Sequence, residues 1–154
     1  MAEKTIMLNC GDDPHRYEAV AAGTIYPGYL IKITSATQVN VHATVGQKCA
    51  TMFAIENSLE GDDIDDAYAS GERLQYIHAK PGDEILAVLK DAQNVSAGGL
   101  LESAGDGQLQ AYAADSAGAA EPDVAIAIAL ESLNLSTSAL GDALSERRIV
   151  VRIL

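Results

Sequence analysis

The chain has 154 residues and a formal net charge of −12. This length suits one domain of ordinary size, and the excess of acidic residues repels a phosphate backbone, which argues against direct binding of nucleic acid. The amino terminus lacks the long apolar core of a signal peptide, and no later stretch approaches the roughly 20 apolar residues that span a bilayer. We therefore expect synthesis in the cytoplasm and no membrane partner.

Strand-length apolar segments recur along the chain. With one Phe and no Trp, the core has to be filled by Ile, Leu and Val, which favours packing between sheets. The first two predicted strands should pair as a hairpin. The six predicted strands cover residues 29–34, 38–44, 50–56, 84–90, 124–131 and 148–154.

Gly-containing turns separate these segments, which together indicate a barrel or a sandwich. Two further stretches, residues 61–68 and 138–145, are candidates for short helices. The predicted turns lie at Tyr26–Tyr29, Lys80–Asp83, Ala97–Leu100 and Gly105–Gln108.

An internal repeat relates the two parts of the chain. Gly28 falls on Gly98 with a difference of 70 in residue number, and the following strands keep this register. The later aligned segments are Phe53–Glu56 with Ile128–Glu131, and Ile85–Ala87 with Ile149–Val151. Because two repeats are too few for a solenoid, we expect them to pack into one core.

The predicted fold is therefore all-β: a compact β-barrel or sandwich built from two tandem pseudo-repeats, with at most short helices. Its parts are an N-terminal arm (1–18) and a single β domain (19–154), with repeat halves at about 24–90 and 94–154.

The N-terminal arm is apolar at Thr5, Ile6, Met7 and Leu8 yet lies outside the repeat. It could add a strand to another chain, where main-chain hydrogen bonds would supply affinity. It could equally be an ordinary edge strand of its own sheet. The first alternative makes these four residues candidate partner contacts.

Tyrosines supply most of the aromatic surface, and Tyr is enriched at protein interfaces. Tyr17, Tyr26, Tyr29 and Tyr68 are therefore further candidates for contacts between subunits. The alternative is that they are half-buried residues of the sheets.

Residues that could support catalysis form no recognisable motif. His15, His42 and His78 are the available bases, but the sequence contains no nucleophile elbow, zinc-protease motif or phosphate-binding loop. Cys10 and Cys49 read as reduced thiols, although a disulfide between them stays open. We predict no enzyme activity, no catalytic residues and no cofactor.

An acidic run at Glu60–Asp66 concentrates carboxylates, but it lacks the spacing of an EF-hand loop. A solvated loop or a helix amino terminus explains it as well, so no metal site is predicted.

Several turn-and-strand patterns resemble small phage proteins known as capsid cement or head decoration proteins. The segments that carry the resemblance are Thr24–Leu30, Ile64–Ala69, Pro81–Glu84, Val95–Leu109 and Val151–Leu154. The second half also resembles, more distantly, the decoration proteins of lambda-like phages, which are β-rich and cap threefold positions of the shell.

This resemblance implies a structural protein on the outside of a virion, bound where major capsid subunits meet. The implied partners are the major capsid protein and further copies of the chain, with a homotrimer favoured and dimers or monomers left open. The resemblance brings no catalytic residues with it. The alternative function is a virion-associated or tail-associated β module that recognises a glycan or another structural protein.

Overall fold

The structure is a computed structural model that describes residues 5–12, 14–114, 123–136 and 143–154, and in these residues it is all-β, as predicted. A 3-10 helix covers Leu144–Arg147. The strands are β1 (Met7–Asn9), β2 (Arg16–Ala21), β3 (Leu30–Ile33), β4 (Gln38–Val41), β5 (Met52–Ala54), β6 (Arg73–His78), β7 (Glu84–Val88), β8 (Asn94–Val95), β9 (Leu100–Ser103), β10 (Leu109–Ala111), β11 (Ala127–Ala129), β12 (Leu133–Asn134) and β13 (Arg148–Ile153).

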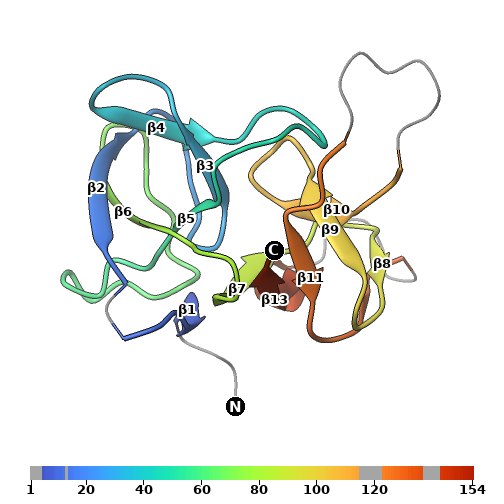
Figure 1. Cartoon of the computed structure of the whole chain (residues 1–154). Helices are drawn as coiled ribbons and strands as arrows, with labels where there is room; N and C mark the ends of the chain where they lie inside the picture. The colour runs from blue at the N-terminus through green and yellow to red at the C-terminus, as the bar shows by residue number, and fades with distance from the viewer. Residues whose placement is uncertain (1–4, 13, 115–122, 137–142) are drawn as a thin grey trace.

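The first half of the chain forms a closed barrel in the strand order β2, β4, β3, β5, β6 (Figure 1). Neighbouring strands are antiparallel, except that β2 meets β4 in parallel through Val20 and Ala21. The predicted hairpin is confirmed as β3 and β4. Closure of this barrel therefore depends on a short parallel contact.

The second half repeats this arrangement in the order β7, β10, β9, β11, β13. All five of these strands lie in one six-stranded sheet. A parallel bridge between Leu89 and Leu109 connects the end of β7 to β10. The sixth strand is β1, which pairs with β7 on the side away from β13. Strands β8 and β12 form a separate two-stranded ribbon.

The two halves correspond pair by pair. The β3–β4 register recurs in β9 and β10 with a difference of 70 in residue number, as the sequence predicts. The β5–β6 register recurs in β11 and β13 with a difference of 75, and the β2–β6 register recurs in β7 and β13 with a difference of 68 for β2. The tandem pseudo-repeat is thus a repeat of strand pairing.

The alignment of Ile85–Ala87 with Ile149–Val151 requires correction. These segments are neighbours in one sheet, since Ile85 pairs with Val151. By register, Ile85 corresponds to Tyr17 and Val151 to Tyr76. The repeating strands therefore run from 16 to 78 in the first half and from 84 to 153 in the second. Each half begins with a strand that precedes its Gly turn, so Glu84–Val88 is the first strand of the second half and not the last strand of the first half.

The expected helix at residues 61–68 is also wrong, since this segment consists of turns and irregular backbone and ends at Tyr68, which forms a β-bridge with Ile25. Its carboxylates bond the local backbone: Asp66 Oδ2 accepts from the N–H of Asp63 at 2.9 Å, and Asp63 Oδ1 accepts from the N–H of Asp65 at 2.8 Å. Such bonds compete with a helix. Most of the other expected helix, 138–145, lies outside the described residues.

Gly28 holds the turn before β3 where the two halves meet. Its φ of 88° fits the third position of the Tyr26–Tyr29 turn after Pro27. A Cβ on Gly28 would lie 2.8 Å from the Leu86 carbonyl oxygen and 2.9 Å from Arg148 Nη1. Only glycine therefore allows both this turn and the close approach of the halves.

One apolar core is shared between the halves. In β5, Met52 and Ala54 face the interior of the first barrel, whereas Phe53 faces out and joins a larger cluster. That cluster also includes Ile6 and the residues that fill the second half, such as Leu101 and Val151. The outer face of the first barrel is thus part of the core of the second half.

We expect Phe53→Ala to lower the free energy of unfolding by about 3–5 kcal/mol, because the ring is fully buried where the halves share their core. Chemical denaturation would measure this, with Val45→Ala as a control that should change stability by less than about 0.5 kcal/mol, since Val45 is exposed. Both halves should unfold in one transition. Two separate transitions in the parent chain would contradict a shared core.

Candidate functional site

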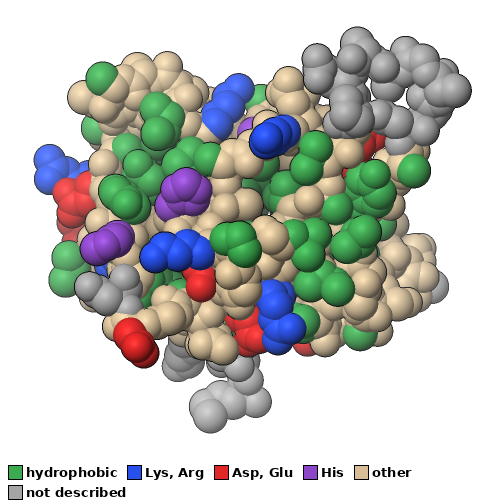
Figure 2. Space-filling model, viewed as in Figure 1, with side chains coloured by type: hydrophobic (Ala, Val, Ile, Leu, Met, Phe, Trp, Pro, Cys, Tyr) green, Lys and Arg blue, Asp and Glu red, His purple; other side chains and the backbone are tan. Residues whose placement is uncertain are grey.

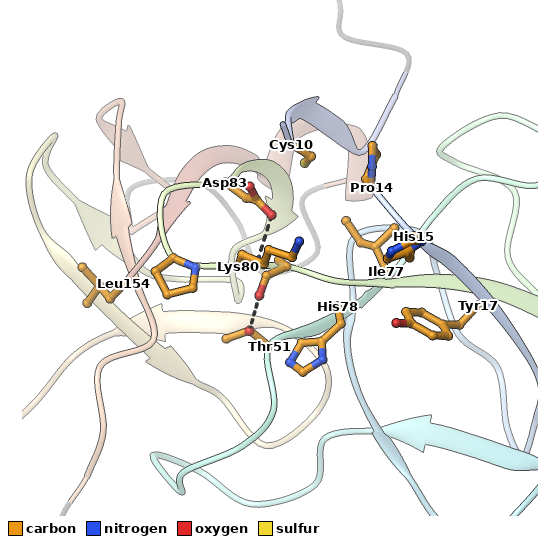
Figure 3. Close-up of a pocket in the computed structure, with 12 residues that line it drawn as sticks. Cys10, Pro14, His15, Tyr17, Thr51, Ile77, His78, Lys80, Asp83 and Leu154 are labelled. Atoms are coloured by element: carbon orange, nitrogen blue, oxygen red, sulfur yellow. Dashed lines mark hydrogen bonds between the residues drawn. The ribbon is translucent and has the colours of Figure 1, made fainter. Parts of the chain in front are cut away.

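A groove of about 350 Å³ lies along the connection between the two halves (Figure 3). His15 and Tyr17 approach it from the start of β2, His78 from the end of β6, and Lys80 and Asp83 from the β6–β7 connection. The sequence separates these groups by more than 60 residues, and the β2–β6 pairing brings them together.

Several contacts hold the lining of this groove in place. The Tyr17 ring stacks on Tyr76 with 5.4 Å between ring centroids and 25° between planes. The N–H of Lys80 donates to Asp83 Oδ2 at 2.8 Å, and Thr51 Oγ1 donates to the Ala79 carbonyl at 2.7 Å. An aromatic face, imidazoles and an ammonium group are therefore presented by a fixed backbone.

The groove presents polar and aromatic side chains to a ligand. Burial, followed by the nearby Asp83, raises the pKa of Cys10, which disfavours the thiolate form. None of the hydrogen bonds found among the described lining residues joins a nucleophile to a base. A polar or anionic group with a flat apolar side would suit this lining.

A serine–histidine contact occurs elsewhere, between His42 and Ser103. His42 Nδ1 lies 2.6 Å from Ser103 Oγ, and both residues are buried. The same hydroxyl accepts from the N–H of Gly105 at 3.2 Å. Because His42 follows β4 and Ser103 ends β9, this buried bond ties the two halves together.

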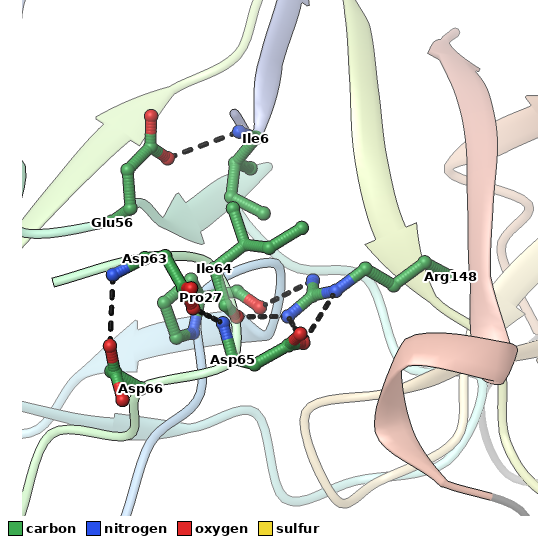
Figure 4. A network of polar contacts seen from close by, with 8 residues as sticks. All are labelled: Ile6, Pro27, Glu56, Asp63, Ile64, Asp65, Asp66 and Arg148. Atoms are coloured by element: carbon green, nitrogen blue, oxygen red, sulfur yellow. Dashed lines mark hydrogen bonds and ion pairs between the residues drawn. The ribbon is translucent and has the colours of Figure 1, made fainter. Parts of the chain in front are cut away.

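A polar network around Arg148 joins β13 to the acidic loop (Figure 4). The guanidinium donates to the carbonyl of Pro27 at 3.0 Å, to the carbonyl of Ile64, and to Asp65 Oδ1 at 3.3 Å. Its side chain is only 5% exposed, whereas that of Asp65 is 52% exposed. Part of the Glu60–Asp66 run is thus bound to an arginine of the second half.

Glu56 fixes the N-terminal segment. Thr5 Oγ1 donates to Glu56 Oε1 at 2.6 Å. The N–H of Ile6 donates to Glu56 Oε2 at 3.1 Å, as Figure 4 shows. Ile6 is fully buried, and Met7 and Leu8 are partly buried against the shared core. Of the two alternatives for this segment, the described residues adopt the edge strand of their own sheet.

The four candidate tyrosines have different surroundings. Tyr17 is 45% exposed in the groove. Tyr26 and Tyr29 lie with ring centroids 5.6 Å apart, and Tyr29 is buried. Tyr68 is buried and donates to the carbonyl of Ile55 at 2.8 Å, and burial raises its pKa to about 12. Tyr17 therefore offers the most surface to a partner, while Tyr29 and Tyr68 pack inside the chain.

Among the described residues, the remaining candidates from the sequence, the two cysteines and the acidic run, form no disulfide and no metal-binding cluster. Cys10 and Cys49 are free thiols, and burial raises the pKa of Cys49 to about 11. Within the described ranges, no group of three or more His, Cys, Asp or Glu side chains is arranged to hold a metal ion. A search of the same residues finds no helix with the length and apolarity to cross a membrane.

Comparison with known proteins gives no assignment: no protein-family model matches the chain, and no curated protein matches it.

We expect Arg148→Met to cost about 2–4 kcal/mol of stability, because it leaves the carbonyls of Pro27 and Ile64 without their buried donor. Arg73 occupies the corresponding position in the first half but is 76% exposed, so Arg73→Met should change stability by less than about 0.5 kcal/mol. Denaturation of both variants would check this. Equal losses would show that the buried bonds contribute nothing.

The stability of the chain should fall as pH drops from 7.5 to 5.5. Burial, followed by Lys32, lowers the pKa of His42 below its ordinary value of 6.5, so the unfolded chain binds this proton first. The contribution of neutral His42 is therefore complete above about pH 6.5 and is lost as pH falls toward the folded pKa. Urea denaturation at several pH values would measure it.

His42→Gln should reduce this pH dependence, whereas His78→Gln, which changes an exposed imidazole, should leave it intact. An unchanged pH dependence in His42→Gln would refute the assignment.

Proposed function

We propose that this chain is a capsid decoration protein, which binds the outside of a phage head where major capsid subunits meet and stabilises the shell. The observation that carries the proposal is the shared core, which joins the closed barrel and its pseudo-equivalent second half into one all-β body. The segments that resemble decoration proteins include the turn at Gly28 and the β9–β10 hairpin, which belong to the frame of this body.

The shared core and the surface composition fit a protein that acts by contact. A ligand that binds the assembled shell and not its free subunits stabilises the shell by mass action. Many identical sites on one shell also let a modest interface suffice. Figure 2 shows hydrophobic side chains over both halves on one face, with histidine and basic side chains among them. Such a surface suits protein contact.

In this proposal, the partners are the major capsid protein and further copies of the chain, with a trimer favoured. The net charge of −12 would match a basic region of the shell. The protein would be made in the host cytoplasm and reside on the capsid exterior.

A second candidate function is a virion or tail-associated module that binds a glycan or another structural protein. The groove around Tyr17, His15 and His78 favours it, because an exposed ring beside hydrogen-bonding side chains is a surface for a polar ligand.

Mixing the purified chain with expanded shells of the major capsid protein from the same phage should give saturable binding, with a fixed number of copies per shell. Bound shells should withstand a higher temperature before disruption, because binding favours the assembled state. Sedimentation and thermal disruption would measure both effects, with an unrelated expanded shell as the control. Failure to bind the cognate shell would contradict the proposal, and binding to immobilised glycans alone would favour the second candidate.

A further inference from the structure

The two halves differ in how the first strand of each is covered. In the second half, β7 has β13 on one side and β1 on the other. In the first half, β2 has β6 on one side, but on the other side it meets β4 only through Val20 and Ala21. Among the described residues, no strand pairs with Arg16–Ala19 on that side. Figure 1 shows β2 at the outer margin of the barrel and β1 beside β7.

The register identifies the backbone groups of β7 that bond to β1, and the equivalent groups of β2 that have no strand beside them. Met7 pairs with Ile85, and the N–H of Leu86 donates to the carbonyl of Ile6 at 2.9 Å. By the difference of 68 between β2 and β7, the residue that corresponds to Leu86 is Glu18.

The N–H of Glu18 faces the open side of β2. The N–H of Val20 points toward β4, since it donates to the carbonyl of Thr37 at 2.8 Å. Backbone N–H groups of a strand alternate in direction, so that of Glu18, two residues earlier, points the same way. The edge at Arg16–Ala19 therefore offers unused ladder positions.

Apolar side chains and hollows flank this edge. On the face of the sheet that points into the barrel, the edge is flanked by Tyr17 and by Ile33, and Ile33 is 58% exposed. On the opposite face it is flanked by Leu59, which is 83% exposed. Hollows of about 310, 130 and 60 Å³ adjoin the edge, and Glu18 lines all three. An added strand would thus find space for side chains on both of its faces.

We propose that the Arg16–Ala19 edge of β2 accepts one extended strand from a partner protein, antiparallel to β2 and with apolar residues at alternating positions. The occupant is argued from the second half, where Ile6–Asn9 fills the equivalent place in this direction and packs Ile6 and Leu8, two residues apart, against the shared core. The donor is another protein and not a second copy, because β1 is already paired with β7 and anchored by Glu56. This inference does not rest on the proposed function.

Amide hydrogen exchange on the full chain tests the open edge first. In the free chain, the Glu18 amide should exchange at least about tenfold faster than the Leu86 amide, because only the second is in a ladder hydrogen bond. Equal protection of the two amides, or protection of Glu18 that rises with protein concentration, would overturn the proposal. The second result would mean that copies of the chain pair with each other.

Two synthetic peptides then serve as probes: a copy of residues 4–9, and a hexapeptide of alternating Thr and Val. At up to millimolar concentration, at least one should slow exchange of the Glu18 amide about tenfold and leave Leu86 unchanged. The same peptides with a central proline should have no effect, since proline lacks the donor. Loss of protection at Leu86, or no protection of Glu18 by either peptide, would overturn the proposal.

Variants of the chain separate backbone pairing from side-chain contact. Glu18→Ala should bind the peptide as the parent does, because Glu18 contributes its backbone. Ile33→Lys should weaken binding by about tenfold, because it places a charge where apolar side chains of the added strand would pack. Loss of binding in Glu18→Ala with none in Ile33→Lys would overturn the strand model.

Discussion

The structure depends on the burial of the outer face of the first barrel. A barrel of five short strands has a small interior, so much of its apolar surface needs a cover from outside. Here Phe53 provides that surface, and the cover is the second half together with Ile6 from the N-terminal segment. Gly28 permits the close approach, and the His42–Ser103 and Arg148 contacts fix the geometry where polar groups would otherwise be left unpaired.

Sequence patterns predicted the parts of the fold in which both halves face the same environment. The Gly turns and the β3–β4 and β9–β10 hairpins recur with a constant residue difference, because a positive φ and a buried face impose the same residues twice. The correspondence of β2 with β7 was missed for the opposite reason. Arg16–Ala21 borders solvent, whereas Glu84–Val88 lies between two strands, so equal backbone positions carry unlike side chains.

The candidate site was harder to predict than the fold. His15 and His78 belong to no sequence motif, and only the β2–β6 pairing shows that they line one groove with Tyr17. Arg148 was equally hidden, because two of its three partners are backbone carbonyls, which leave no trace in sequence, and the third, Asp65, is distant along the chain. Burial divides the candidate tyrosines, and their spacing gave no indication of it. Contacts made between distant segments by the backbone are outside the reach of local patterns.

The difference between the halves lies in what covers equivalent positions. Leu86 corresponds to Glu18 and Val150 to Gln75, so the face that packs against β1 and the first barrel in one half is polar in the other. Glu18 is exposed and meets water, whereas Gln75 is buried, and neither side chain satisfies the open backbone edge of β2. Side chains can adapt a repeated unit to solvent one residue at a time, but an edge is satisfied only by water or by another strand. A repeat in which one copy has its edge covered by the chain itself therefore leaves the other copy with the same geometry and an edge open to other chains.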